Sequence, residues 1–463
     1  MGNVTFVSPD SRPKPGSKGT VRGTYFIQTW GCQMNEEDSE QMALYLRDMG
    51  FQPASSWRDA EVVLLNTCSV RRKPEDKALS FLGELVPIKE ARPNMVIGVA
   101  GCMAQIKADY IRQRNPHVDF VIGTAQVSKI PEMVDAALHT KRFRKRMDLP
   151  ERKGAVVTDI PQRNLERHSK LKAFVPIQYG CDKFCTFCIV PSTRGRERSR
   201  PTEHIVQEVR RLVELGTKEV TLLGQTVNSY GKNLAEGRVP FAQLLQLLSG
   251  IPGLERIRYT SPYPRDFKSD LIDVIRDVPQ VVEYCHMPLQ AGSDSELKRM
   301  KRLYTRESFR KIVQELRAKI PDIGITTDMI VGFPGETEEE FEETLDAMRE
   351  FRFDGAYMFR YSPRPGTPAA LEEQIPLQVG KDRLNKLIDV QTEIVMEINE
   401  AQIGKEFEVL VEGASPKDPG VLQGYSRCFR MMHFAGDADR YRGELVTVRA
   451  TQAYKWGLSG EIV

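Results

Sequence analysis

The residues that decide the fold read Ala173-Phe174-Val175-Pro176-Ile177-Gln178-Tyr179-Gly180-Cys181-Asp182-Lys183-Phe184-Cys185-Thr186-Phe187-Cys188. An apolar run, which we predict to be a strand, ends here in a loop with three cysteines within eight residues. Three thiolates at this spacing can reach three irons of one cubane cluster and leave the fourth iron open to a ligand. A zinc site is the alternative reading, but zinc usually takes four ligands in paired spacing, and no fourth ligand lies nearby.

Apolar runs recur from Ala173 to about Thr367, and amphipathic helices separate most of them. The six runs are Ala173–Gln178, Glu219–Leu223, Arg256–Thr260, Val281–Met287, Gly324–Val331 and Gly355–Tyr361. Six β/α repeats predict an open, partial version of the eight-stranded barrel, a (β/α)6 barrel. Ligands in such folds bind at the C-terminal ends of the strands, which is where the cysteine loop begins.

The N-terminal region up to about Thr140 also alternates short apolar runs with helical stretches. Its predicted strands are Tyr25–Thr29, Val62–Asn66, Met95–Ala100 and Val118–Ile122, and a helix after the first strand ends near Gly50. Strands that alternate with helices favour a parallel, doubly wound sheet.

Three further cysteines, Cys32, Cys68 and Cys102, each follow the end of one of these strands. Because the ends of parallel strands share one edge of the sheet, the three thiols are expected to converge. Gly31 and Gly101 would permit the backbone turns that a bulky cluster requires. Three separate buried cysteines are the alternative. We favour a second cluster held by three cysteines.

The fold class that we predict is α/β, with a β-rich C-terminus. Residues 1–23 are expected to be a disordered tail, 24–140 an N-terminal parallel α/β domain, 141–166 a linker, 167–399 the barrel, and 400–463 a small OB-like β-barrel. The barrel region ends in a polar helix at about Gly380–Gln402, and the β-rich runs are Glu406–Val411, Val421–Phe429 and Glu444–Ala450. The basic residues at 141–146 are either a solvated part of the linker or an RNA contact, and a strand is possible at Ala155–Thr158.

Composition excludes several classes of protein. The net charge is +3 and the sequence pI is about 8.3, so the total charge does not by itself indicate a nucleic-acid binder. No apolar run is long enough to span a membrane, and the N-terminus lacks the apolar segment of a secretory signal. We therefore expect a cytoplasmic protein whose eight cysteines are thiols or metal ligands. Cys285 and Cys428 lie in predicted strands without partners and are expected to be core residues.

The sequence around both cysteine triads resembles the radical-SAM methylthiotransferase family. The words that carry this likeness are Asn66-Thr67-Cys68-Ser69-Val70-Arg71, Tyr179-Gly180-Cys181 through Cys188-Ile189-Val190-Pro191, Arg194-Gly195-Arg196-Glu197-Arg198-Ser199-Arg200, His286-Met287-Pro288-Leu289-Gln290-Ala291-Gly292-Ser293 and Gly332-Phe333-Pro334-Gly335-Glu336-Thr337. The likeness runs from Tyr25 to the C-terminus. It implies an N-terminal α/β domain, a radical-SAM core and a C-terminal TRAM domain.

The resemblance also implies an activity. The motifs listed above are most similar to those of one branch of the family. That branch converts isopentenyl-adenosine, next to the anticodon of transfer RNA, to its 2-methylthio derivative. It implies two four-iron–four-sulfur (4Fe-4S) clusters, one on Cys181, Cys185 and Cys188 and one on Cys32, Cys68 and Cys102. The first cluster would reduce S-adenosylmethionine to a radical that oxidises the adenine carbon, and the second would supply sulfur. A second S-adenosylmethionine would supply the methyl group.

Other residues are predicted to bind the cofactor and the RNA. Gln225, Gln290, Ser293 and Asp328 lie at or near later strand ends and are candidates for S-adenosylmethionine. Arg194, Arg196, Arg198 and Arg200 alternate and would share one face of an extended segment, where they could contact RNA. In the C-terminal barrel the candidates for RNA contact are Arg427, Arg430, His433, Phe434, Tyr454, Lys455 and Trp456. The expected partners are the transfer RNA anticodon loop and an electron donor such as flavodoxin or ferredoxin, with a monomeric chain.

Two alternative functions stay open on the sequence alone. Related branches of the family modify threonylcarbamoyl-adenosine in transfer RNA or an aspartate of a ribosomal protein. A protein of another class would hold two clusters only to carry electrons. The barrel, the Gly332–Thr337 segment and the C-terminal domain argue against a simple carrier.

Overall fold

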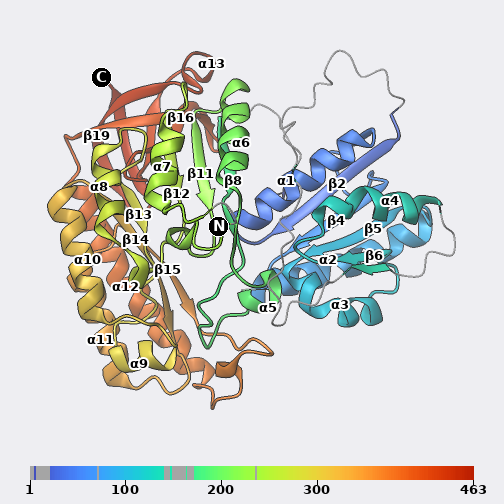
Figure 1. Ribbon diagram of the computed structural model, residues 1–463, viewed down its shortest axis with the longest axis horizontal. Coiled ribbons are helices and arrows are strands. Elements are labelled where there is room, and N and C mark those ends of the chain that lie inside the picture. The colour runs from blue at the N-terminus through green and yellow to red at the C-terminus, as the bar shows by residue number, and fades with distance from the viewer. Residues whose placement is uncertain are drawn as a thin grey trace. The chain divides into compact units, whose positions relative to one another are not determined.

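The computed structural model describes residues 5–6, 21–69, 72–139, 146–148, 163, 171–234 and 237–463. Its contacts divide the chain into two compact units (Figure 1). Unit 1 holds Met1–His168, Gln178–Phe184 and Cys188–Arg200, and unit 2 holds Ser169–Ile177, Cys185–Phe187 and Pro201–Val463. The cysteine loop quoted above therefore contributes residues to both units.

Unit 1 is built on a sheet whose central strands are parallel. In spatial order they are β2 (Gly23–Trp30), β4 (Val62–Thr67), β5 (Val96–Gly101) and β6 (Phe120–Ile122). Three short strands complete it, namely β1 (Thr5–Phe6) and β3 (Phe51–Pro53) beside β2, and β7 (Arg146–Asp148) beside β6. The four predicted strands and the parallel sheet are confirmed. The two- or three-residue strands at the edges are too short to leave an apolar run in the sequence.

Helices cover both faces of this sheet. They are α1 (Gln33–Asp48), α2 (Arg72–Ala91), α3 (Cys102–Arg114) and α4 (Ile130–His139). Val63 and Ile97 pack in one core with residues of α2 and α3, whereas Leu64 and Val96 pack in a second core with α1 and α4. Strands buried on both faces read as continuous apolar runs, which is why they are visible in the sequence. The smaller elements are η1 (Val127–Lys129), β9 (Gln178–Tyr179), α5 (Val190–Arg194) and β10 (Arg198–Ser199).

The predicted tail and linker fall mostly outside the described residues. Within the tail, Thr5–Phe6 forms β1, which pairs antiparallel with β2, so this part differs from the expected disorder. Within the linker, β7 pairs with β6. The possible strand at Ala155–Thr158 lies outside the described residues.

Unit 2 contains six parallel strands. In chain order they are β8 (Lys172–Pro176), β11 (Glu219–Leu223), β12 (Arg256–Tyr259), β13 (Tyr284–His286), β14 (Gly324–Val331) and β15 (Gly355–Arg360). They form two three-stranded parallel sheets, and a bridge between Ile257 and Val281 joins β12 to the start of β13. The spatial order thus equals the chain order, and all six predicted strands of the open (β/α)6 barrel are confirmed.

The helices of unit 2 pack outside these strands around one large core (Figure 1). They are α6 (Thr202–Glu214), α7 (Phe241–Ser249), α8 (Ser269–Asp277), α9 (Asp294–Arg299), α10 (Arg306–Lys319), α11 (Glu338–Phe351) and α12 (Leu377–Glu400). Short 3-10 turns lie at η2 (Val227–Ser229), η3 (Pro264–Asp266) and η4 (Pro368–Ala370). Ile257 and Met329 point into this core, so their strand neighbours Arg258 and Asp328 point to the barrel interior.

The C-terminal residues of unit 2 form a closed β-barrel. Its strands are β16 (Glu406–Ser415), β17 (Asp418–Ser426), β18 (Met431–Ala435), β19 (Leu445–Tyr454) and β20 (Gly457–Ile462), with the short helix α13 (Ala438–Tyr441). The order around the barrel is β16-β17-β18-β20-β19. The small barrel and three of its strands were predicted. β18 and β20 were missed, because β18 follows the predicted run after a tight turn and β20 contains two glycines.

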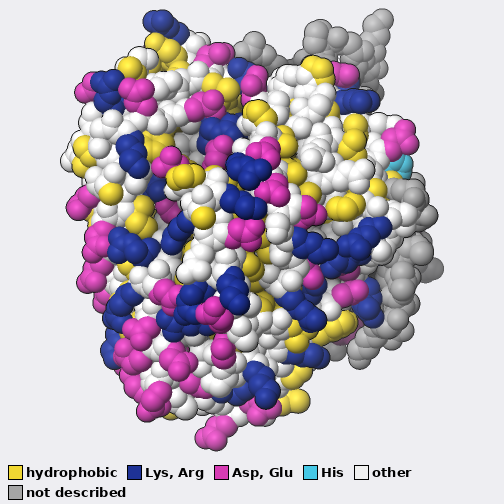
Figure 2. Space-filling view, turned by 60° about the vertical axis from the view of Figure 1, so that its left-hand side comes forward, with side chains coloured by type: hydrophobic (Ala, Val, Ile, Leu, Met, Phe, Trp, Pro, Cys, Tyr) yellow, Lys and Arg dark blue, Asp and Glu magenta, His cyan; other side chains and the backbone are white. Residues whose placement is uncertain are grey.

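The surface of the protein carries both signs of charge. On the face drawn in Figure 2, Lys and Arg side chains are intermixed with Asp and Glu side chains over the described residues. This mixture agrees with the small net charge of the chain. Among the described residues, none of the helices combines the length and the apolar character that a membrane span needs.

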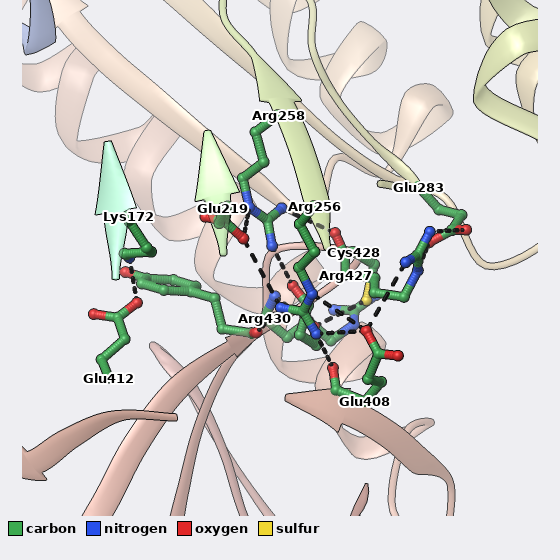
Figure 3. Close-up of polar contacts among 12 residues, drawn as sticks. Lys172, Glu219, Arg256, Arg258, Glu283, Glu408, Glu412, Arg427, Cys428 and Arg430 are labelled. Carbon is green, nitrogen blue, oxygen red and sulfur yellow. Dashed lines mark hydrogen bonds and ion pairs between the residues drawn. The ribbon is translucent and has the colours of Figure 1, made fainter. Parts of the chain in front are cut away.

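The C-terminal barrel packs on N-terminal strand ends of the six-stranded barrel, and Figure 3 shows the contacts that Lys172 and Arg256 make with it there. Arg256, the first residue of β12, is fully buried and donates to the backbone oxygens of Glu408 and Tyr425, each at 2.9 Å. Arg258 donates to the backbone oxygens of Ser426 and Arg427 at 2.7 and 2.9 Å. Ligands of such barrels bind at the opposite, C-terminal ends of the strands. The C-terminal barrel therefore closes the end of unit 2 that lies opposite the C-terminal ends of the strands.

An aromatic side chain completes this junction. The ring of Phe429 lies 4.6 Å from the ring of Tyr425 and 4.6 Å from that of Tyr284, and the Arg258 guanidinium lies 5.3 Å from it. The turn that carries Phe429 also passes close to β14. A Cβ atom on Gly324 would lie 2.2 Å from the backbone oxygen of Cys428. Gly324 is thus required for the close approach of the two barrels.

Replacing Gly324 with Ala should destabilise the junction. The added methyl group overlaps the backbone oxygen of Cys428, and overpacking of this kind typically costs about 1–3 kcal/mol. Denaturant unfolding should show this loss. Gly83→Ala is the matched control, because Gly83 is an exposed residue of α2 with open space around its Cα, and the change should stabilise the chain by about 0.5–1 kcal/mol. Equal stability of the Gly324→Ala protein and the wild type would contradict the close approach.

Candidate metal centres

The three N-terminal cysteines lie at one edge of the sheet in unit 1. The register pairs Trp30 with Thr67, and Thr67 with Gly101, so the residues that follow each strand are neighbours. The backbone N–H of Cys68 donates to the oxygen of Trp30 at 2.9 Å. A Cβ atom on Gly31, beside Cys32, would lie 2.9 Å from the Cβ of Cys68. The parallel register therefore brings three cysteines from three separate segments to one edge of the sheet.

A glycine permits this gathering at the third strand. Gly101 has φ of +93°, and a side chain there would lie 2.4 Å from Asn66 Oδ1 and 2.6 Å from the Thr67 oxygen. The backbone can make this turn only without a Cβ atom. Helix α3 then begins at Cys102, which places this cysteine at the edge of the sheet.

Buried polar groups form one wall of this edge. Asn35 Nδ2 donates to Asn66 Oδ1 at 2.9 Å, and the thiol of Cys32 donates to Asn35 Oδ1 at 3.4 Å. Arg194 Nη2 lies 2.9 Å from Asp38 Oδ2, and both side chains are buried. These contacts fix the direction of the first thiol and place a positive charge close to the group.

The electrostatics of the edge reflect that burial. Burial raises the pKa of the Asp38 carboxyl to about 6, although the adjacent Arg194 guanidinium favours the charged form. Burial also raises the pKa of the Cys102 thiol, again against the attraction of Arg194. A thiolate at Cys102 needs a compensating positive charge, such as a bound metal, to form at neutral pH.

The loop that carries Cys181, Cys185 and Cys188 forms hydrogen bonds within each unit. In unit 1, the N–H of Cys181 donates to the Gly195 oxygen at 3.1 Å, and Gly180 has φ of +72°. In unit 2, Thr186 donates through its backbone to Met300 and through its hydroxyl to Arg299, at 3.1 and 2.9 Å. These bonds hold the loop in place without engaging its thiols.

The donor set fits iron–sulfur clusters. All eight cysteines are free of disulfides, so the six of the two triads can serve as thiolate ligands. Within the part of the chain that the structure describes, no three His, Cys, Asp or Glu side chains close on one point that could hold a single ion. A cubane binds each thiolate through a different iron, so its ligands do not need to meet at one point. Cys285 and Cys428 are buried, as predicted for core residues.

Two of the predicted cofactor residues meet at β14. The N–H of Gln290 donates to the oxygen of Asp328 at 2.9 Å, and the N–H of Ile330 donates to the oxygen of Gln290 at 2.8 Å. Gln290 adopts φ of +80°, which is rare for a residue with a side chain and often marks a functional site. Asp328 Oδ2 also lies 3.4 Å from Nε2 of His286. His286 was not predicted as a site residue, although its position at the end of β13 could have indicated it.

The other two predicted cofactor residues lie apart from this contact in the chain. Gln225 is the second residue after the end of β11 and is partly exposed. Ser293 is buried at the start of α9, and its hydroxyl lies 2.8 Å from that of Ser295. Both therefore lie on the C-terminal side of barrel strands, as predicted.

The four arginines after the cysteine loop do not share an exposed face. Arg194 ends the helix α5, and Arg198 and Arg200 are buried. Arg198 donates to the backbone oxygen of Arg194 at 3.0 Å. Only Arg196 keeps a substantially exposed side chain, and it pairs with Asp182 at 2.6 Å. The prediction of one RNA-facing stripe is wrong, because the chain turns between Arg194 and Arg198 instead of remaining extended.

The basic and aromatic residues of the C-terminal barrel also differ in their roles. Arg427 pairs with Glu283, Arg430 pairs with Asp354, and Phe434 is in the core of the small barrel. These three side chains are therefore engaged in contacts within unit 2. His433 is partly exposed. Trp456 is 83% exposed and Tyr454 is 46% exposed, and Lys455 lies between them in the β19–β20 hairpin.

A pair of buried carboxyls lies beside the Gly332–Thr337 turn. Glu336 accepts from the N–H of Gly332 at 2.6 Å and from Arg383 at 2.7 Å, and Thr337 caps α11. Glu296 is fully buried, and neither of its carboxyl oxygens has a hydrogen-bond partner among the described residues. Burial, followed by the charge of Glu336, raises the pKa of Glu296 far above its ordinary value.

Family models match three parts of the chain. The radical SAM superfamily matches residues 175–348, the uncharacterized protein family UPF0004 matches residues 24–123, and the TRAM domain matches residues 400–463. These three matches follow the order of the N-terminal sheet, the six-stranded barrel and the C-terminal barrel.

Relatives match nearly the whole chain. A tRNA-2-methylthio-N(6)-dimethylallyladenosine synthase of Moorella thermoacetica is 47% identical over 96% of this chain and 99% of the relative. The protein of the same name from Geobacillus kaustophilus is 45% identical over 99% of this chain and 86% of the relative. The radical S-adenosylmethionine methyltransferase TsrM of Kitasatospora setae, solved with cobalamin and a 4Fe-4S cluster, has a similar fold, with a TM-score of 0.53 at 14% identity, over 75% of this chain and 74% of that chain.

The fold, the cysteine triads and these matches define a radical-SAM enzyme of the transferase class. Within that class, the chain belongs to the radical-SAM methylthiotransferase family, and the relatives above carry the name tRNA-2-methylthio-N(6)-dimethylallyladenosine synthase.

The buried Glu296 gives a test of the carboxyl pair through pH. Between the unfolded pKa of about 4.3 and the raised folded pKa, the unfolded chain has released a proton that the folded chain keeps, so stability falls as pH rises. Glu296→Gln is neutral at every pH and should stabilise the protein at about pH 8 by about 1–3 kcal/mol, with little effect at about pH 4. Thermal unfolding across this range measures the difference. Glu342→Gln, an exposed change on α11, should leave the pH profile unaltered, and an identical result for both variants would refute a protonated Glu296.

Proposed function

We propose that this enzyme adds a methylthio group to isopentenyl-adenosine next to the anticodon of transfer RNA. The observation that carries the proposal is the position of Cys32, Cys68 and Cys102 after three neighbouring strand ends, in a chain that also has the three-cysteine loop. A carrier of electrons needs no such combination with a (β/α)6 barrel and a TRAM domain. The names of the relatives support the choice of substrate.

Each triad would hold one 4Fe-4S cluster. Cys181, Cys185 and Cys188 would leave one iron open for S-adenosylmethionine, and the N-terminal triad would hold the cluster that supplies sulfur. When bound, these groups supply the one-electron chemistry that a C–H bond of an aromatic ring requires, since such a bond has no useful acidity. Two molecules of S-adenosylmethionine are consumed per turnover in this scheme, one of them as the methyl donor.

The chain's own residues would orient the cofactor. Gln290 and Asp328, joined through their backbones at β14, would direct polar groups at S-adenosylmethionine, with Gln225 and Ser293 at neighbouring strand ends. His286 can fix the carboxylate of Asp328 through their 3.4 Å contact. The Gly332–Gly335 turn has two residues with positive φ and would let the backbone approach the cofactor closely.

Transfer RNA would contact the hairpin Tyr454-Lys455-Trp456. Two exposed rings and a cation fit a base lifted out of a loop, because every base has a face on which an aromatic ring can stack. Arg196 is the member of the predicted arginine set that could still reach phosphate. An external one-electron donor of the flavodoxin or ferredoxin type would reduce the clusters. We further propose that the enzyme acts as a monomer in the cytoplasm.

The triads can be separated by substitution. Changing Cys181, Cys185 and Cys188 to Ala should halve the iron content after anaerobic reconstitution, from about eight to about four per chain, and should abolish cleavage of S-adenosylmethionine. Changing Cys32, Cys68 and Cys102 should also halve the iron but spare cleavage, and the methylthio product should vanish. Iron analysis, 5′-deoxyadenosine release and mass spectrometry of the RNA nucleosides measure these effects.

The remaining two cysteines give the control for that experiment. Cys285 and Cys428 are buried core residues, so changing both to Ala should leave the iron content intact. A full complement of iron in either triad variant would exclude that triad as a cluster site. Continued product formation without Cys32, Cys68 and Cys102 would exclude the N-terminal triad as the source of sulfur.

The hairpin contact can be tested with Trp456. Trp456→Ala should weaken transfer RNA binding by about tenfold, because stacking of one base contributes about 1–3 kcal/mol, and Trp456→Phe should keep most of the affinity. Leu371→Ala, at another exposed apolar residue that is 88% exposed, should bind as the wild type does. Filter binding at fixed salt measures all three, since the affinity depends strongly on salt. Unchanged affinity in Trp456→Ala would remove the hairpin from the RNA-binding surface.

A further inference from the structure

Arg302 in unit 2 makes a direct contact with a predicted cluster ligand. It follows the end of α9, far from the cysteine loop in sequence. Its Nη1 donates to the sulfur of Cys185 at 3.3 Å. No feature of the sequence indicated this contact, because the two residues are 117 positions apart.

The guanidinium is held in a fixed position. Its Nε donates to the hydroxyl of Tyr304 at 2.8 Å, and its Nη2 donates to the Pro288 oxygen at 3.3 Å. The rings of Tyr263 and Tyr304 lie 4.7 and 5.0 Å from its carbon. Both tyrosines are buried and their ring centroids lie 5.6 Å apart, so the cation lies beside both rings and cannot turn away from Cys185 without breaking several contacts.

The two tyrosines that hold Arg302 belong to the core of unit 2. The hydroxyl of Tyr304 lies 2.9 and 2.8 Å from the backbone oxygens of Pro288 and Leu289, in the segment that leads to Gln290. The backbone N–H of Leu303 donates to the Tyr263 hydroxyl at 3.1 Å. The position of Arg302 is therefore set by the same segment that carries the predicted cofactor residues.

No carboxylate of the described residues pairs with the charge of Arg302. Among the residues that the structure describes, Arg302 forms no ion pair with Asp or Glu, whereas Arg194 and Arg383 each pair with a buried carboxylate. Arginine keeps its charge at every accessible pH. Within this part of the chain, the acidic groups to which Arg302 donates a hydrogen bond are the thiol of Cys185 and the hydroxyl of Tyr304, and a thiol is a stronger acid than a phenol.

We propose that Arg302 is a positioning residue that sets the reduction potential of the cluster bound by Cys185. This inference rests on the proposed function, in which Cys185 is a cluster ligand. Reduction adds one electron from an external donor and makes the cluster more negative, while no bond forms or breaks and Arg302 keeps its protons. A fixed cation and a hydrogen bond to the sulfur stabilise the more negative state, so Arg302 raises the potential. A cellular donor can then load the electron more readily.

The decisive measurement is a redox titration followed by electron paramagnetic resonance. It uses the full-length protein in which Cys32, Cys68 and Cys102 are Ala, so that one cluster gives the signal. Arg302→Gln should lower the ratio of reduced to oxidised cluster at a fixed potential by about tenfold, which is about 59 mV for a one-electron couple. The potential of Arg302→Lys should lie between that of Arg302→Gln and that of the parent protein. Lysine keeps the charge but loses the planar set of N–H donors. Lys298→Gln removes an exposed charge from the same segment and should leave the potential in place.

The iron content separates the two hypotheses. If the parent protein with Arg302 binds no cluster, the proposed function fails first. If Arg302→Gln and the parent bind equal iron and share one potential, the role of Arg302 is overturned. If Arg302→Gln loses its cluster, the reduction potential of Tyr304→Phe tests the role of Arg302 instead. This variant keeps Arg302 but removes the hydroxyl that orients it. A lower potential in Tyr304→Phe, smaller than the shift expected for Arg302→Gln, supports the proposal, and an unchanged one overturns it.

Discussion

Parallel pairing of buried strands is the constraint on which both candidate sites depend. Strands that run in the same direction deliver the residues after their carboxyl ends to one edge. In unit 1 this edge receives Cys32, Cys68 and Cys102, and in unit 2 it receives Gln290 and its neighbours. A shift of one residue would turn every side chain of a strand to the other face. The two apolar cores of unit 1 therefore fix the positions of the thiols as well as the stability of the sheet.

The helices and strands that could be predicted from the sequence are those whose buried residues form a regular apolar pattern. Strand β4, whose first four residues are apolar, and the six barrel strands were predicted because their apolar runs repeat between helices. The short strand β7 and the glycine-containing β20 carry no comparable pattern. The prediction that the N-terminal cysteines share one edge of the sheet followed from their positions after parallel strands.

Charged residues were harder to predict, because their burial depends on partners that are distant in sequence. The pattern of Arg194 to Arg200 reads as an exposed stripe, but Arg194 reaches Asp38 and becomes buried. Arg427 reads as an RNA contact, but it pairs with Glu283 across the junction. Arg302 reads as an ordinary helix-end residue, and only the fold brings it to Cys185. Sequence patterns identify which residues are apolar, but they do not identify where a buried ion finds its counterion.

The junction of the two barrels shows how such buried ions shape unit 2. The interior of the six-stranded barrel carries Glu219, Arg256 and Arg258 near its N-terminal end, where Arg258 lies 3.0 Å from Glu219. Ions removed from water are costly unless each has close partners, and backbone oxygens of the C-terminal barrel supply those partners.

The C-terminal barrel is therefore needed for the stability of the six-stranded barrel as well as for any contact with RNA. Its removal would leave Arg256 without its bonds to Glu408 and Tyr425. These ions lie at the N-terminal ends of the strands, and the predicted cofactor residues lie towards the C-terminal ends. The separation lets the same strands serve both purposes, since a buried network at one end does not compete for space or charge with the chemistry at the other. A test of RNA binding by deletion would disturb both ends together, so substitutions in the exposed hairpin isolate the RNA contact more cleanly.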